Sequence, residues 1–138
     1  MSKKNKKPTL TPTNIVKARE TLLSVIQLLD DHKITYHLEG GTLLGIVRDK
    51  DLLPWDYDTD ISIPQEFAHR IPSLRFQFLK MGYKLTARKS LVDAGPIRKG
   101  DYSIFKIKPL KPYLISWILP SYIRHVITLD IFVKSHDA

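Results

Sequence analysis

The sequence contains no cysteine, which excludes disulfide bonds, thiolate metal ligands and cysteine nucleophiles. It also lacks any uninterrupted apolar run approaching the roughly 20 residues that a helix needs to span a bilayer. The basic start of the chain is not followed by an apolar segment, so it does not have the pattern of a secretory signal. There is no internal repeat. These absences fit a reducing compartment, and we expect a cytoplasmic protein.

Acidic residues are few: 14 Asp and Glu against 22 Lys and Arg give a formal net charge of +8. Four of the lysines lie in residues 1–10, which we interpret as a basic, flexible tail. The alternative is a tether to an anionic surface, either a membrane leaflet or nucleic acid. The remaining excess of about +4 suits a phosphate-binding site without requiring one. The length and an apolar fraction of 43% predict a single domain over residues 11–138.

The hydrophobic pattern predicts helices that alternate with short strands. Helical patterns occur at 11–31, 42–48 and 67–78, the last interrupted by Pro72. Strand patterns occur at 34–38, 58–63, 83–87, 102–107 and 126–133. Residues 110–124 are apolar and basic, and their pattern assigns them to neither class. The order favours an α/β or α+β fold in which a small mixed sheet is flanked by helices.

Asp58 and Asp60 form the first candidate site. Side chains two apart on a strand point to the same face, so these carboxylates are expected to project together. Two carboxylates this close repel each other unless a cation lies between them. Mg²⁺ or Mn²⁺ fits, since hard cations take oxygen ligands and leave positions for water and phosphate. The alternative is a solvated turn, because D-x-D is a common pattern.

Such a site usually needs a third carboxylate, and Asp130 is the candidate because it interrupts an otherwise apolar strand. A charge buried there without a partner would be costly. The alternative is that Asp130 lies on an edge strand and faces water.

A glycine turn precedes the carboxylates. Gly40 and Gly41 follow a strand and open a helix, where backbone N–H groups can approach a phosphate. Thr42 can bond a phosphate oxygen or cap the helix, and Arg48 could reach the same diphosphate. A tight turn with a surface arginine is the alternative. Trp55 either packs its loop or provides a shelf for a base or an acceptor.

Taken together, residues 36–48 (YHLEGGTLLGIVR) and 53–61 (LPWDYDTDI) closely resemble the signature of the LicD/fukutin family, in which G-T-L-L-G-x-x-R precedes P-W-D-x-D-x-D. The resemblance implies a nucleotidyltransferase fold and transfer of a phosphorylated alcohol, phosphocholine or an alditol phosphate, from a CDP-linked donor to a glycan. It implies that Gly41 and Thr42 line the donor phosphates and that Asp58 and Asp60 carry metal ions. Asp130 would be the third carboxylate and the base for the acceptor hydroxyl.

The chain departs from the family pattern in two places. Tyr57 stands where many members have another aspartate, which leaves the D-x-D intact. The chain ends eight residues after Asp130, earlier than is usual in the family. Three interpretations follow: a compact version of the domain, a C-terminally truncated fragment, or a chain that has lost activity.

Three functions are therefore compared. The first is a LicD-type transferase acting on cell-envelope glycans, with residues 1–10 and 110–124 holding it at the inner membrane surface beside a lipid-linked acceptor. The second is a minimal nucleotidyltransferase that modifies a small molecule or a protein. The third is a non-catalytic relative that binds phosphates or nucleic acid, although nucleic acid is not the expected partner.

Overall fold

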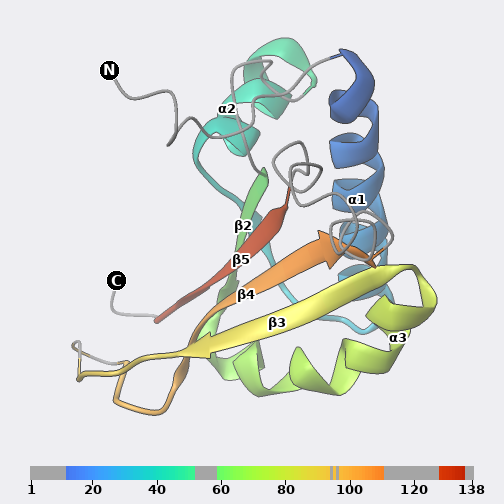
Figure 1. Ribbon diagram of the computed structural model, residues 1–138. Coiled ribbons are helices and arrows are strands. Elements are labelled where there is room, and N and C mark those ends of the chain that lie inside the picture. Colours follow the sequence, from blue (N-terminus) through green and yellow to red (C-terminus); the bar gives the residue numbers. More distant parts are fainter. Residues whose placement is uncertain (1–11, 52–58, 94, 96, 111–127, 136–138) are drawn as a thin grey trace, which may run out of the picture.

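A computed structural model describes residues 12–51, 59–93, 95, 97–110 and 128–135 of the chain. Its elements follow the order α1 (Pro12–Asp31), β1 (His37–Leu38), α2 (Gly40–Asp49), β2 (Thr59–Pro64), the 3-10 helices η2 (Gln65–Arg70) and η3 (Pro72–Leu74), α3 (Arg75–Lys80), β3 (Tyr83–Lys89), β4 (Tyr102–Pro109) and β5 (Leu129–Lys134) (Figure 1). The prediction of a small mixed sheet flanked by helices is confirmed. The tail at 1–10 and most of 110–124 lie outside the described residues.

The five strands form one sheet in the order β1-β2-β5-β4-β3. β2 and β5 are parallel, and every other neighbouring pair is antiparallel. β5 is therefore the central strand, with β2 on one side and β4 on the other (Figure 1). The interpretation of Asp130 as a residue of an edge strand is wrong, because both edges of β5 are hydrogen-bonded to neighbours.

Helix α1 packs on one face of this sheet through an apolar stripe. Ala18, Leu22, Val25 and Leu29 are buried at helical spacing and belong to the same core as Ile131 of β5. The helix ends at Asp31, after which Lys33 takes a left-handed conformation with φ of 56°.

The segment between β2 and β3 covers the rest of that face. Pro72 divides it, as predicted, because proline cannot donate a helical hydrogen bond. Ala68, Ile71 and Phe78 are buried in the same core as the stripe of α1, so the segment and α1 lie on one side of the sheet. Gly82, with φ of 90°, follows the helical segment at the turn into β3.

Strand alternation separates a core face from a polar face. Residues of the core face are fully or nearly fully buried: Ile61, Ile63, Leu85, Phe105, Ile107, Leu129, Ile131 and Val133. The register places Asp60, Lys106 and Asp130 on the opposite face, since their neighbours along each strand point into the core. These three charged residues therefore share the face that α1 does not cover.

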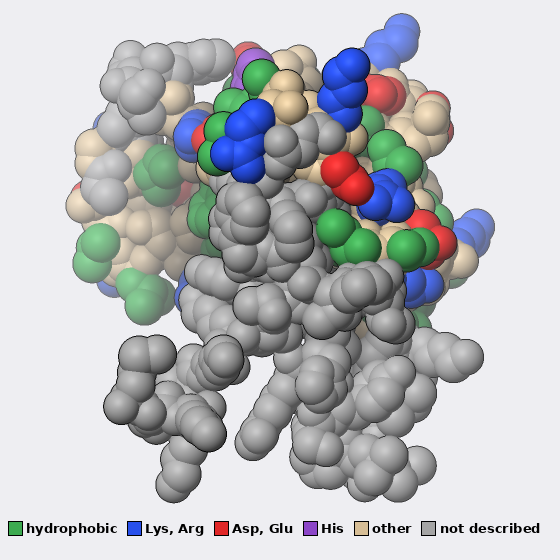
Figure 2. Space-filling model, turned by 90° about the horizontal axis from the view of Figure 1, so that it is seen from above, with side chains coloured by type: hydrophobic (Ala, Val, Ile, Leu, Met, Phe, Trp, Pro, Cys, Tyr) green, Lys and Arg blue, Asp and Glu red, His purple; other side chains and the backbone are tan. Residues whose placement is uncertain are grey.

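Helix α2 lies at one end of the sheet and is tied to α1. The Arg19 guanidinium forms a two-pronged ion pair with the Asp51 carboxylate, at 3.0 and 2.6 Å. Leu43, Leu44 and Val47 of α2 are exposed. Figure 2 looks down on this end of the molecule and shows hydrophobic side chains at the surface among charged ones.

Among the described residues, no helix is long and apolar enough to cross a membrane.

Candidate functional site

Asp60 and Asp130 stand side by side in the sheet. They are register partners on the parallel strands β2 and β5, which lie about 4.8 Å apart, so both side chains project from the polar face. The two residues are 70 positions apart in the sequence. The structure thus brings together two of the three predicted carboxylates through a pairing that neither strand specifies locally.

Asp130 is buried, with 5% of the residue exposed. Its Oδ1 atom is inaccessible to solvent and accepts no hydrogen bond in the described structure. Lys106, the register partner on β4, holds its Nζ 3.5 Å from Oδ1, a distance that gives charge compensation without a hydrogen bond. A buried carboxylate with an unfilled acceptor position is costly unless a ligand completes it. Lys106 could not be singled out from the sequence, because a lysine on an alternating strand usually faces water.

The glycine turn is attached directly to Asp60. The backbone N–H of Asp60 donates to Thr42 Oγ1 at 2.9 Å, and the backbone N–H of Glu39 donates to the Asp60 carbonyl at 3.0 Å. Thr42 is 1% exposed, so this contact is enclosed. Two hydrogen bonds therefore join the N-terminus of α2 to the carboxylate strand.

Gly40 is required at the turn by its backbone conformation. Its φ is +51°, and a Cβ atom built there would lie 3.9 Å from Asp60 Oδ2, an ordinary contact. The helix has no side-chain cap, since the Glu39 carboxylate turns elsewhere. The first N–H groups of α2 have no intrahelical acceptors and lie beside Asp60.

The Glu39 carboxylate links the turn to both carboxylate strands. Its Oε1 accepts from Ser62 Oγ of β2 at 2.6 Å and from Lys134 Nζ of β5 at 2.8 Å. Ser62 is 2% exposed, and the Glu39 side chain is 28% exposed. The hydrogen bonds from Lys134 and Ser62 hold the pKa of Glu39 below its ordinary value. Sequence reasoning missed this network, which depends on the parallel register.

Replacement of Glu39 by glutamine is expected to lower the free energy of unfolding by about 1 kcal/mol near neutral pH, because a charge-assisted bond is lost at a partly exposed position. The folded-state pKa is depressed, so this stabilisation is present above the ordinary pKa of Glu39 and disappears as the pH falls through the lowered value. Urea unfolding of wild type and Glu39→Gln at both ends of that range checks this. A difference that stays constant with pH would contradict it.

The remaining predicted site residues have a less direct relation to the carboxylate pair. Gly41 lies in the first turn of α2, whereas Arg48 lies in its last turn, about 10 Å along the helix axis. The role of Arg48 at a diphosphate therefore stays a prediction. Asp58 and Trp55 lie outside the described residues, and their roles also stay predictions. Within the described ranges no group of three His, Asp or Glu side chains could hold a metal ion, and the predicted set includes Asp58.

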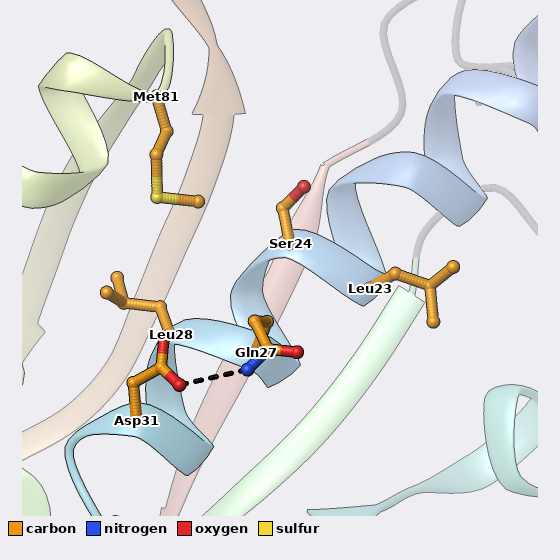
Figure 3. A pocket seen from close by; sticks show the side chains of 6 residues that line it. All are labelled: Leu23, Ser24, Gln27, Leu28, Asp31 and Met81. Atoms are coloured by element: carbon orange, nitrogen blue, oxygen red, sulfur yellow. Dashed lines mark hydrogen bonds between the residues drawn. The ribbon is translucent and has the colours of Figure 1, made fainter.

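A shallow hollow lies elsewhere, between α1 and the end of α3. Leu23, Ser24, Gln27, Leu28, Asp31 and Met81 line it, and Gln27 Nε2 donates to Asp31 Oδ1 at 2.9 Å (Figure 3). It lies on the side of the sheet that α1 covers, away from the paired carboxylates. Its lining contains no cation, which makes it unsuited to a nucleotide diphosphate.

Comparisons with a family profile and with individual known proteins agree on one family. The profile of the family described as "LicD/FKTN/FKRP, nucleotidyltransferase domain" matches residues 33–138. The chain is 42% identical over 66 residues to ribitol 5-phosphate transferase FKRP from Homo sapiens, covering 47% of this chain and 13% of that protein. It is 32% identical over 65 residues to lipopolysaccharide cholinephosphotransferase LicD from Haemophilus influenzae, covering 47% of this chain and 24% of that protein. The matched segment is thus less than a quarter of the length of either relative.

Proposed function

The chain belongs to the LicD/FKTN/FKRP family of nucleotidyltransferase domains, and from this premise we propose that it transfers a phosphorylated alcohol from a CDP-linked donor to a glycan. The transferred group would be phosphocholine or an alditol phosphate, in keeping with the names of the two relatives. Mg²⁺ or Mn²⁺ would be the cofactor. The acceptor would be a glycan of the cell envelope or a lipid-linked glycan.

One observation carries this proposal: Asp60 and Asp130 are register partners beside the uncapped N-terminus of α2. Paired carboxylates supply the hard oxygen ligands that Mg²⁺ and Mn²⁺ prefer. The helix N-terminus supplies N–H donors and a partial positive charge for phosphate oxygens. A donor with a diphosphate linked to an alcohol needs both features within a few ångströms of each other.

The residues present fit a divalent cation. Asp130 Oδ1 is a buried acceptor without a hydrogen bond, and Asp60 lies next to it on the parallel strand. We propose that these two carboxylates and Asp58 hold the metal. When bound, the ion would neutralise the diphosphate and lower the pKa of the attacking hydroxyl.

The chain's own groups have separate tasks in this proposal. Gly40 and Gly41 present backbone N–H groups to the donor phosphates. Thr42 is enclosed and bonded to Asp60, so we assign it to positioning that carboxylate. Lys106, whose ammonium lies at the edge of the pair, would contact a phosphate oxygen of the donor.

The transfer itself replaces one bond to phosphorus by another. The acceptor hydroxyl oxygen attacks the phosphorus that carries the alcohol, and its proton passes to the Asp130 carboxylate. The phosphoanhydride P–O bond breaks and CMP leaves with that bond's electron pair. The role of the protein is mainly positioning and charge stabilisation, as in other phosphoryl transfers.

Calorimetric titration with CDP-choline, CDP-ribitol and CTP, each with and without Mg²⁺ or Mn²⁺, tests the proposal. We expect metal-dependent binding of a CDP-alcohol that falls at least about tenfold in Asp60→Asn. Asp31→Asn is the matched control, because Asp31 is an exposed carboxylate on α1. Preference for CTP would instead favour nucleotidyl transfer, and binding unchanged in Asp60→Asn would refute a metal site at the carboxylate pair.

A further inference from the structure

The connection between β3 and β4 carries two apolar side chains that are strongly exposed. Leu91 is 84% exposed, the highest value among the large apolar residues of the described chain, and Val92 beside it is 64% exposed. A single exposed leucine would need no explanation. Two adjacent exposed apolar residues at the end of a hairpin do need an explanation. In Figure 1 this connection projects beyond the remainder of the sheet.

Four exposed cations flank this pair along the hairpin. Arg88 and Lys89 lie at the end of β3, and Arg98 and Lys99 lie in the connection just before β4. The two acidic residues nearby, Asp93 and Asp101, are engaged with the loop itself. Their carboxylates accept the backbone N–H groups of Lys99 and Arg98, at 2.9 and 3.0 Å. The four cations outnumber these two carboxylates, so the net charge of the hairpin end is positive.

The loop is held in place by its own hydrogen bonds. The N–H of Ser90 donates to the Asp101 carbonyl at 2.8 Å, and the N–H of Gly100 donates to the Ser90 carbonyl at 2.9 Å. The Ser90 hydroxyl donates to the Val92 carbonyl at 2.6 Å. These bonds satisfy polar backbone groups inside the loop and leave the side chains of Leu91 and Val92 outside. The side chains of Leu91 and Val92 can therefore enter an apolar medium with little additional ordering of the described part of the loop.

We propose that the end of the β3–β4 hairpin is a membrane-contact surface for an anionic leaflet. Leu91 and Val92 enter the boundary between headgroups and acyl chains, and Arg88, Lys89, Arg98 and Lys99 contact lipid phosphates. A site for single-stranded nucleic acid would instead present aromatic platforms beside its cations. The two most exposed side chains here are aliphatic, which favours the bilayer.

This surface is independent of the proposed transfer reaction, yet it has a geometric relation to the carboxylates. Lys106, the partner of Asp130, lies four residues along β4 from Tyr102 at the base of the hairpin. At the rise of a strand this is about 13 Å. A hairpin end seated in the headgroups would thus hold Asp60 and Asp130 above the plane of the bilayer.

The absence of native cysteine allows a direct test on the full chain. A nitroxide is attached to Leu91→Cys and, as a control, to Val47→Cys, which is 72% exposed on α2. The probes are vesicles of phosphatidylcholine with and without phosphatidylglycerol, and collision with oxygen and with a polar nickel complex reports immersion. We expect the label at position 91 to become immersed only with anionic vesicles, while the label at 47 stays in water.

A sedimentation assay with the same vesicles supplies the second measurement. Leu91→Ser combined with Val92→Ser is expected to lower the partition coefficient at least about tenfold, whereas Val47→Ser leaves it unchanged. The proposal is overturned if the chain binds vesicles while the label at 91 remains in water. It is equally overturned if the chain ignores anionic vesicles, or if an oligonucleotide binds through the same cations regardless of Leu91.

Discussion

Replacement of Asp130 by asparagine is expected to reduce transfer by about a thousandfold or more while leaving the free energy of unfolding unchanged or higher. The activity falls because the neutral amide is a poor ligand for a hard cation and cannot take the acceptor's proton. The stability is kept because Asp130 is a buried residue, 5% exposed, and its carboxylate Oδ1 has no hydrogen bond. Asparagine removes the buried charge and keeps nearly the same shape.

Lys106 does not reverse this expectation. Its side chain is 36% exposed, so the ammonium is solvated once its partner is neutral. Removal of one partner from a fully buried ion pair would be severe, but a half-exposed cation loses little. The unfolding free energy should therefore stay unchanged or rise by up to about 1 kcal/mol.

Transfer from CDP-choline and urea unfolding, measured on the same preparation, check the prediction for Asp130. Asp31→Asn serves again as the control, with both properties unchanged. A variant that loses several kcal/mol of stability while keeping its activity would show that Asp130 is a structural carboxylate held by Lys106.

The second large effect is expected for Thr42→Val. The substitution keeps the shape of the side chain but removes the acceptor for the backbone N–H of Asp60, leaving a donor unsatisfied in an enclosed position. Such a loss costs about 1–3 kcal/mol of unfolding free energy. Because Asp60 is no longer fixed to the turn, the affinity for the metal and donor should also fall about tenfold.

Two variants separate positioning from general destabilisation. Thr42→Ser retains the hydroxyl and should recover most of the donor affinity. Thr21→Val removes a hydroxyl that is equally buried but donates to the Lys17 carbonyl on α1, away from the carboxylates. It should lower stability without changing donor affinity. If Thr21→Val and Thr42→Val affect binding alike, Thr42 has no special relation to Asp60.

The elements were predictable where a local pattern specified them. The apolar stripe of α1, the break at Pro72 and the glycine at the start of α2 each depend on neighbouring residues. Even there, Val25 is fully buried whereas the adjacent Ile26 is only partly buried, and helical spacing alone does not choose between these two apolar residues. A small rotation of the helix against the sheet decides between two adjacent apolar residues, and the sequence does not encode it.

The site was predictable only in part for a related reason. Asp60 stood out as part of a D-x-D pair, and Asp130 because it interrupts an apolar strand, yet their adjacency depends on a parallel pairing across 70 positions. Glu39, Ser62 and Lys134 resemble ordinary surface residues until that register brings them together. From the sequence alone, a polar residue that faces solvent on an alternating strand cannot be distinguished from one that supports a site.

The central position of β5 also has a consequence during synthesis. β5 follows β2 and β4 in the chain but lies between them in the sheet, so both strands keep unpaired edges until residues 129–134 leave the ribosome. Open edges beside apolar faces favour pairing with other chains. The nascent chain should therefore depend on chaperones before β5 emerges, and the carboxylate pair forms only when β5 inserts between β2 and β4.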